Sequence, residues 1–128
     1  MALMKDVVFD CEHPASLARF WAEAVDGYRV APYDEAELAR LCEMGVEDPE
    51  DDPGVLVEPS SPGHPRLYFQ KVPEPKSVKN RVHLDLRADD VEAEVKRLVA
   101  LGAAELDRQG SWVTLRDPEG NEFCIDRS

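Results

Sequence analysis

The sequence has no long hydrophobic run, no closely spaced cysteine pair and no excess of basic residues. No apolar stretch approaches the roughly 18 residues that a transmembrane helix needs, so we expect no membrane partner. Residues 1–5 also lack the apolar stretch of a secretory signal peptide, which predicts a cytoplasmic protein. Cys11, Cys42 and Cys124 show no Cys-x-x-Cys spacing, so we expect reduced thiols rather than a disulfide framework or a zinc knuckle.

What the chain does contain is the composition of an ordinary globular domain. Of its 128 residues, 43% are hydrophobic and 33% are charged, which predicts a single domain, residues 1–128, with a hydrophobic core. Acidic residues outnumber basic residues by 27 to 15, and the formal net charge is −12. Because a nucleic acid is itself a polyanion, this charge argues against nucleic-acid binding.

The negative charge is concentrated in residues 34–59. This segment holds ten acidic residues against the single base Arg40, a net charge of −9. Within it, residues 47–54 combine like charges with prolines and a glycine, which is typical of a solvated loop. The acidic spacing does not match that of a calcium-binding loop. We therefore interpret residues 34–59 as an acidic surface insertion.

The first half of the chain predicts four strands and one main helix. Residues 5–11 alternate in polarity, as a half-buried strand does. Apolar side chains recur at helical spacing between residues 17 and 25, and Gly27 supplies a stop. Further strands are predicted at residues 28–33, 55–57 and 66–72, and a short acidic helix at residues 35–43.

The second half begins after Pro73 and Pro75, which cannot continue a hydrogen-bonded strand. Residues 80–87 alternate cleanly in polarity and predict a strand. The polar face of that strand carries Arg81, His83, Asp85 and Arg87. A helix is predicted from a cap at Asp89 to Gly102, followed by strands at residues 103–108, 112–116 and 122–126.

The two halves repeat one order of elements: strand, helix, strand, strand, strand. Residues 8–11 align with residues 83–86, and Gly27 aligns with Gly102 at the same offset. The sequence therefore predicts an α+β fold of two βαβββ modules. Module 1 is about residues 5–72, including the insertion 34–59, and module 2 is about residues 80–127. Since each module is too small to bury both faces of a sheet, we expect helices on the outer face and polar side chains on the other.

Four groups of residues, which together span nearly the whole chain, resemble a known family. They are residues 8–21, residues 69–76, residues 80–86 and the Asp-Pro-Glu-Gly-Asn turn at residues 117–121 with the strand that follows it. In them the sequence resembles the vicinal oxygen chelate superfamily, and within it the small glyoxalase-like domains. The resemblance implies paired βαβββ modules in a cup-shaped mixed β-sheet, a homodimer and a small-molecule ligand.

The resemblance also implies where a metal would bind. Metal-dependent members place four ligands, histidines and carboxylates, on the first and last strands of each module. The matching positions here hold Val8, Gln70, His83 and Cys124. Only His83 is of the expected type, so we predict no metal ligands, no cofactor and no metal-dependent glyoxalase I activity. A divalent cation stays open as the alternative if the strand register brings Asp6 or Asp10 into the place of Val8.

His83 is the strongest candidate for a catalytic residue, because an imidazole can act as acid, base or hydrogen-bond donor near neutral pH. The alternative is a paired polar residue on a sheet face. Asp85 could orient His83, but residues two apart on a strand lie about 7 Å apart at the backbone. Cys124 has the alternative of a small packed thiol. The candidate ligand-binding residues are Asp10, Gln70, Arg81, Asp85, Arg87 and Cys124.

Residues 66–87 carry a net positive charge, opposite in sign to that of the whole chain. They hold six basic and two acidic residues, a net charge of +4, which suits an anionic or carbonyl-rich ligand. The alternative is that these bases pair with the acidic insertion of the same subunit or of a partner.

The sequence leaves three functions open. The first is a glyoxalase-like protein that binds a small polar organic molecule and acts on it as a lyase or isomerase through His83. The second is a non-catalytic protein that sequesters a metabolite or an antibiotic, which the incomplete metal-ligand set favours. The third is a dimerising domain without a ligand.

Overall fold

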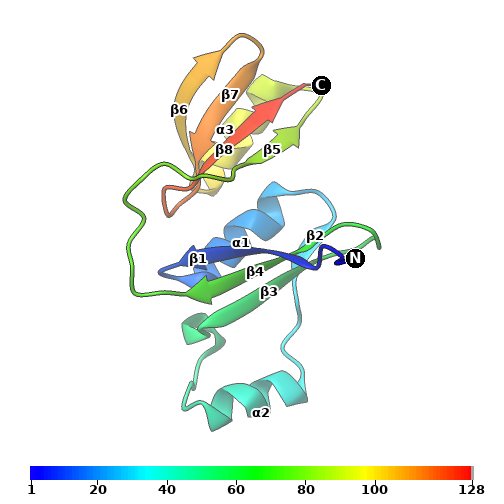
Figure 1. Cartoon of the computed structure of the whole chain (residues 1–128), viewed down its shortest axis with the longest axis vertical. Coiled ribbons are helices and arrows are strands. Elements are labelled where there is room, and N and C mark those ends of the chain that lie inside the picture. Colours follow the sequence, from blue (N-terminus) through cyan, green and yellow to red (C-terminus); the bar gives the residue numbers. More distant parts are fainter. Residues whose placement is uncertain (128) are drawn as a thin grey trace. The chain divides into compact units, whose positions relative to one another are not determined.

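The computed structural model describes residues 1–127, which form two compact units (Figure 1). One unit is Met1–Pro75, and the other begins at Lys76. Each unit contains one mixed sheet of four strands, with helices in the connections between the strands. The predicted α+β class and the predicted pair of βαβββ modules are confirmed.

The first sheet has the strand order β1-β4-β3-β2. Its strands are β1 (Asp6–Cys11), β4 (Arg66–Lys71), β3 (Gly54–Pro59) and β2 (Tyr28–Val30). β1 runs parallel to β4, and β3 is antiparallel to both β4 and β2. This mixed pairing fixes which side chains of β1 and β4 share a face.

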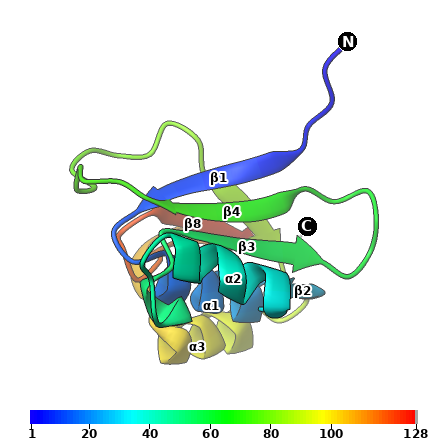
Figure 2. The same cartoon turned by 90° about the horizontal axis from the view of Figure 1, so that it is seen from below.

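Helix α1 (Pro14–Ala24) packs against one face of this sheet (Figure 2). Its apolar stripe is buried, and Trp21 is only 1% exposed. The Trp21 ring lies 5.3 Å from the ring of Phe9, which in turn stacks 4.8 Å from that of Phe69. Aromatic contacts of this kind contribute beyond the apolar area that they bury. The other face of the sheet carries Val8, Leu56 and Tyr68 together with the polar side chains of Asp10 and Gln70.

The acidic insertion is folded rather than a free loop. It contains helix α2 (Glu35–Glu43) and the 3₁₀ turn η1 (Pro49–Asp51). The Asp34 carboxylate accepts a hydrogen bond from the backbone N of Glu37 and so caps α2. The prediction of a solvated loop at residues 47–54 is wrong at Asp52, which is 1% exposed.

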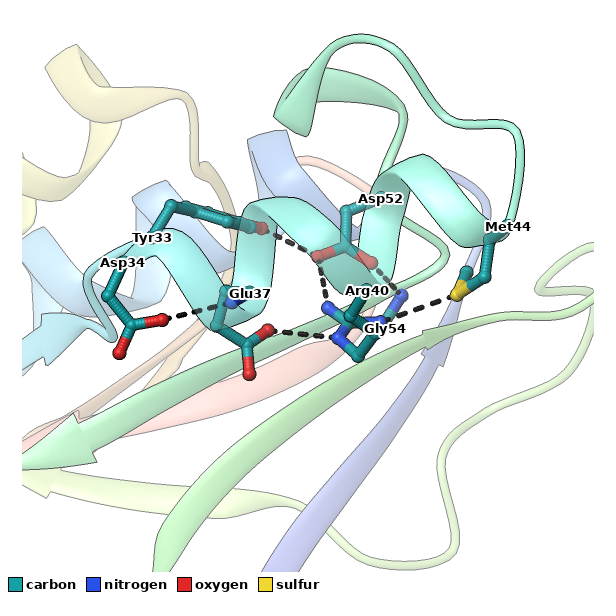
Figure 3. Close-up of polar contacts among 7 residues, drawn as sticks. All are labelled: Tyr33, Asp34, Glu37, Arg40, Met44, Asp52 and Gly54. Carbon is teal, nitrogen blue, oxygen red and sulfur yellow. Dashed lines mark hydrogen bonds and ion pairs between the residues drawn. The ribbon is translucent and has the colours of Figure 1, made fainter.

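Asp52 is buried because three neighbours satisfy its carboxylate (Figure 3). Its Oδ2 accepts hydrogen bonds from the Tyr33 hydroxyl at 2.7 Å and from the Arg40 guanidinium at 3.1 Å, and its Oδ1 accepts one from the backbone N of Gly54 at 2.9 Å. Burial and the bond to Asp52 raise the pKa of Tyr33 above its ordinary value, so the phenol keeps its proton and remains a donor. These hydrogen bonds connect the segment between η1 and β3 to Arg40 of α2.

The second sheet has the order β5-β8-β7-β6, which repeats the order of the first. Its strands are β5 (Leu84–Arg87), β8 (Glu122–Asp126), β7 (Trp112–Arg116) and β6 (Ala104–Gln109). β5 runs parallel to β8, and β7 is antiparallel to both of its neighbours. The repeat read from the sequence is therefore a repeat of strand topology.

Helix α3 (Val91–Leu101) contacts β6 and β8. Leu98 on the helix and Leu115 and Phe123 on the strands are each 0% exposed, and they form the centre of this unit's core. The residues that alternate with these strand positions lie on the opposite face, which we call the polar face of the second sheet.

Two predicted boundaries in this unit are wrong. The strand expected at residues 80–87 begins only at Leu84, since the backbone N of Asn80 donates to the Glu122 side chain instead of to a strand partner. The cap of α3 is Asp90 rather than Asp89, because the Asp90 carboxylate accepts from the backbone N of Ala93.

Candidate functional site

A row of polar side chains crosses the polar face of the second sheet. Strand register pairs Asp85 of β5 with Cys124 of β8, Cys124 with Thr114 of β7, and Thr114 with Asp107 of β6. Paired residues on neighbouring strands point to the same side of a sheet. The row therefore brings together residues that lie up to 39 positions apart in the sequence.

Three side chains of this region lie close together: those of Asp85, Cys124 and His83. His83 is the residue directly before β5. Nε2 of His83 lies 3.3 Å from Oδ1 of Asp85. One ring nitrogen of His83, one carboxylate oxygen of Asp85 and Sγ of Cys124 all lie within 4.8 Å of one another. The His83 and Asp85 side chains are 42% and 75% exposed, so solutes can reach them. We call these three residues the His-Asp-Cys cluster.

The contact between His83 and Asp85 is closer than the strand spacing alone indicates. Because His83 precedes the first paired residue of β5, its side chain is not held perpendicular to the sheet as a residue inside the strand would be. The cluster offers an imidazole, a carboxylate and a thiol to one small volume. Such a set can hold a polar ligand or a metal ion.

Thr114 is the residue of this site that the sequence did not indicate. Its Oγ1 lies 3.3 Å from Sγ of Cys124. Finding it requires knowing that β7 pairs with β8 and in which register, and neither is readable from alternation within a single strand. The alternation in residues 112–116 does correctly place Thr114 on the face opposite the buried Val113 and Leu115.

The first sheet holds a different pair at the equivalent place. Asp10 and Gln70 are register partners on β1 and β4, and the Gln70 amide donates to the Asp10 carboxylate at 2.7 Å. Val8 pairs with Tyr68, so the alternative register that would bring another residue into the place of Val8 does not occur. Asp6 pairs with Arg66, whose hydrogen bonds lower the pKa of the Asp6 carboxyl.

These residues do not fit the four-ligand metal site that the resemblance implies. Val8 has no ligand atom, and Gln70 is engaged by Asp10. Within residues 1–127, the His-Asp-Cys cluster is the one group of three His, Cys, Asp or Glu side chains close enough to hold an ion. All three of its residues belong to the second unit.

The two remaining predicted residues lie apart from the cluster's centre. Arg87 is on β5, and with Arg97 it lines a shallow hollow of about 590 Å³ at the start of α3. Arg81 is exposed and precedes the strand. Two bases of the positively charged segment form ion pairs outside the acidic insertion, Arg66 with Asp6 and Lys76 with Glu122.

Glu122 holds the segment that leads to His83. Its side chain is 8% exposed, and it accepts from Nζ of Lys76 at 3.0 Å and from the backbone N of Asn80 at 2.8 Å. Burial alone would raise the pKa of Glu122, but these hydrogen bonds outweigh it and the pKa is lowered. The carboxylate therefore fixes the chain three residues before His83.

The turn before β8 is built by Asp117. Its Oδ1 accepts hydrogen bonds from the backbone N of Glu119 and of Asn121, and Gly120 adopts a φ of +90° that favours glycine. This geometry accounts for the Asp-Pro-Glu-Gly-Asn segment. The turn leads directly into β8, in which Cys124 pairs with Asp85 of β5.

A family model described as a glyoxalase-like domain matches residues 6–125. The chain belongs to this family. No functionally curated protein matches the sequence. Within the described residues of this glyoxalase-like protein, no helix has the length and apolar character needed to cross a membrane.

Solved structures show the same fold at low sequence identity. A glyoxalase/bleomycin resistance protein/dioxygenase family enzyme from Burkholderia phytofirmans is 16% identical, with 98% of each chain covered and a TM-score of 0.67. The fosfomycin resistance protein FosX from Mesorhizobium loti is 14% identical, with 100% of this chain and 93% of that chain covered and a TM-score of 0.66. TnmS3, an antibiotic binding protein from a Streptomyces species, is 19% identical, with 99% and 96% covered and a TM-score of 0.59. At these identities the likeness concerns the fold.

Proposed function

We propose that this glyoxalase-like protein binds a small polar organic molecule on the polar face of the second sheet, with His83 in contact with it. The observation that supports the proposal best is the convergence of an exposed imidazole, a carboxylate and a thiol in the His-Asp-Cys cluster. Ligand sites use a small number of convergent polar groups to orient the ligand, and the exposure of His83 and Asp85 leaves these groups accessible to it.

The ligand class that fits is a small carboxylic acid with an oxygen on the neighbouring carbon. Arg87 is the base on β5 and alternates onto the same strand face as Asp85, so it suits the carboxylate of such an acid. The imidazole of His83 and the hydroxyl of Thr114 can bond the neighbouring oxygen. We also expect a homodimer, which the family resemblance implies, and a cytoplasmic protein, which the sequence predicts.

The enzymatic form of this proposal is a lyase or isomerase in which His83 touches the reacting atoms. The second candidate is a sequestering binder, which Trp112 favours. Its indole is 45% exposed on β7 and shares a face with Thr114, so it can stack on a flat ligand. FosX and TnmS3, which share the fold, are described as a resistance protein and an antibiotic binding protein.

Binding can be measured by tryptophan fluorescence during titration with glyoxylate, pyruvate and lactate. Trp21 is 1% exposed, so a small solute can contact only the other tryptophan, Trp112, and the quenching reports on Trp112. We expect saturable quenching that weakens at least about tenfold in His83→Ala, because the variant loses a hydrogen bond to the ligand. His64→Ala, which removes an exposed histidine of a turn in the other unit, is the matched control. Equal affinity in His83→Ala and the wild type would contradict the proposal.

Proton NMR in deuterium oxide distinguishes the two candidate functions, enzyme and sequestering binder. Exchange of the methyl protons of pyruvate for solvent deuterium, lost in His83→Ala, would support the lyase or isomerase. Saturable binding without exchange would support the sequestering protein.

A further inference from the structure

Glu122 lies on the polar face of the second sheet, and yet it is buried. It alternates with the core residue Phe123, so it shares the polar face with Cys124, two positions further along β8. Cys124 is half-buried, whereas Glu122 is only 8% exposed. Because a carboxylate is rarely buried unless it is paired, another part of the chain has to cover and pair Glu122 at this end of the sheet.

The part that pairs with Glu122 is the segment of residues 76–80. Residues 72–83, all of which are described, contain no helix or strand. The two carboxylate oxygens of Glu122 hold the two ends of the segment: Oε1 accepts from Nζ of Lys76 at 3.0 Å, and Oε2 accepts from the backbone N of Asn80 at 2.8 Å. Nζ of Lys76 also donates to the backbone carbonyl of Val78, in the middle of the segment. We call these contacts the Glu122 clamp.

The Glu122 clamp lies next to His83. Leu84 of β5 pairs with Phe123 of β8, and extending this parallel register by one residue brings His83 level with Glu122. His83 therefore lies between two fixed points of the backbone, the clamp at Asn80 and the first strand pair at Leu84. Since no strand pairing holds His83 itself, the place of its imidazole depends on the backbone on either side of it.

We propose that Glu122 is a positioning residue for the ligand site: by holding residues 76–80 against the sheet, it sets the approach of the backbone to His83 and so places the imidazole 3.3 Å from the Asp85 carboxylate. Glu122 acts through His83 rather than on a ligand, because both of its oxygens are already engaged by this chain. The inference deepens the proposed function and rests on it for the effect on ligand binding, whereas the effect on His83 needs no ligand.

The alternative is a carboxylate that contributes to stability alone. In that case a Glu122 variant that remains folded keeps its ligand affinity and an unchanged His83. Glu122→Gln is the informative substitution, since the amide keeps the shape of the side chain but loses the charge that pairs with Lys76, and its NH₂ group cannot accept a hydrogen bond. Lys76→Met breaks the same contact from the other side.

Proton NMR of the imidazole C–H signals, at neutral pH and without ligand, tests the effect on His83. The signal missing from His83→Ala identifies the residue, and we expect that signal to shift in both Glu122→Gln and Lys76→Met. The two substitutions change the local charge in opposite senses, so a shift common to both reports geometry. Lys76→Arg, which retains a cationic donor, should return the signal toward its wild-type position. The signals of His13 and His64, which belong to the other unit, should stay unchanged.

The fluorescence titration with glyoxylate, pyruvate and lactate tests the effect on binding. We expect Glu122→Gln and Lys76→Met each to weaken binding about fivefold, the effect of one poorly placed hydrogen bond. The double variant should bind within about twofold of Glu122→Gln, because both substitutions act through one contact. Lys79→Met, which removes an exposed base from the same segment, is the matched control and should keep the wild-type affinity.

Far-ultraviolet circular dichroism establishes that each variant is folded, and Lys76→Met answers the same question if Glu122→Gln does not fold. An unchanged His83 signal or wild-type affinity in the folded variants would overturn the positioning role. An equal loss of affinity in Lys79→Met would also overturn it, since the loss would then report the charge of the segment. Failure of the proposed function looks different: none of the three acids would quench the wild type, while the His83 signal would still respond to both substitutions.

Discussion

At the scale of single residues, two buried carboxylates organise segments that look solvent-exposed in the sequence. Asp52 lies in the acidic insertion between η1 and β3, and Glu122 begins β8. Each accepts hydrogen bonds from a backbone N and from a basic side chain. Asp52 follows Glu50 and Asp51, so composition alone cannot separate this anchoring carboxylate from the solvated ones beside it.

Asp52→Ala should lower the free energy of unfolding by about 2–3 kcal/mol, because it leaves the Tyr33 hydroxyl and the backbone N of Gly54 without their acceptor. Urea denaturation measures the change. Asp51→Ala, which removes the exposed acid next to it, should stay within about 0.5 kcal/mol of the wild type. Equal effects of the two substitutions would show that the network contributes nothing to stability.

Glu122 predicts a specific loss of stability in acid. The pKa of its carboxyl is lowered from an ordinary value of 4.5 in the folded protein, so its contribution is present above that value and disappears as the pH falls through the lower, folded-state pKa. Urea denaturation between neutral pH and about pH 3 should show a decline in stability that is shallower in Glu122→Gln.

Glu74→Gln, which changes an exposed acid near the end of the first unit, is the control for this pH series and should leave the acid decline unchanged. If Glu122→Gln declined as steeply as the wild type, the acid sensitivity would have to come from other carboxylates, such as that of Asp6 beside Arg66.

At the scale of secondary structure, periodicity predicted which elements exist better than where they begin. The helices α1, α2 and α3 and the order of strands along each half of the chain follow from the sequence, whereas the order of strands within each sheet does not. The errors lie at ends, where a side chain competes with the backbone for a hydrogen bond. Glu122 takes the backbone N of Asn80 and delays β5, while Asp90 rather than Asp89 satisfies the first turn of α3.

Two adjacent aspartates therefore offer a direct test of a helix cap. Asp90→Ala should destabilise the protein by about 1 kcal/mol, because the backbone N of Ala93 loses its acceptor. Asp89→Ala removes the same side chain one position earlier and should have a much smaller effect. Thermal unfolding of the two variants measures the difference, and a larger loss in Asp89→Ala would contradict the observed cap.

At the scale of the whole molecule, the sequence predicted the repeat of elements. It predicted only in part which side chains the strands bring together. Alternation placed His83 and Asp85 on one face of a predicted strand, and the offset between the halves aligned Asp10 with Asp85. The approach of Cys124 depends on the parallel register of β5 and β8. Such pairing joins residues far apart in the chain, and no local pattern encodes it.

The two sheets use one strand order to present different polar groups. Asp10 with Gln70, and Asp85 with Cys124, occupy corresponding places in that order. The first pair is joined by an amide hydrogen bond, whereas Asp85 contacts His83 and Cys124 contacts Thr114. The same backbone framework therefore carries a carboxylate and an amide in one unit, and a carboxylate, an imidazole and a thiol in the other.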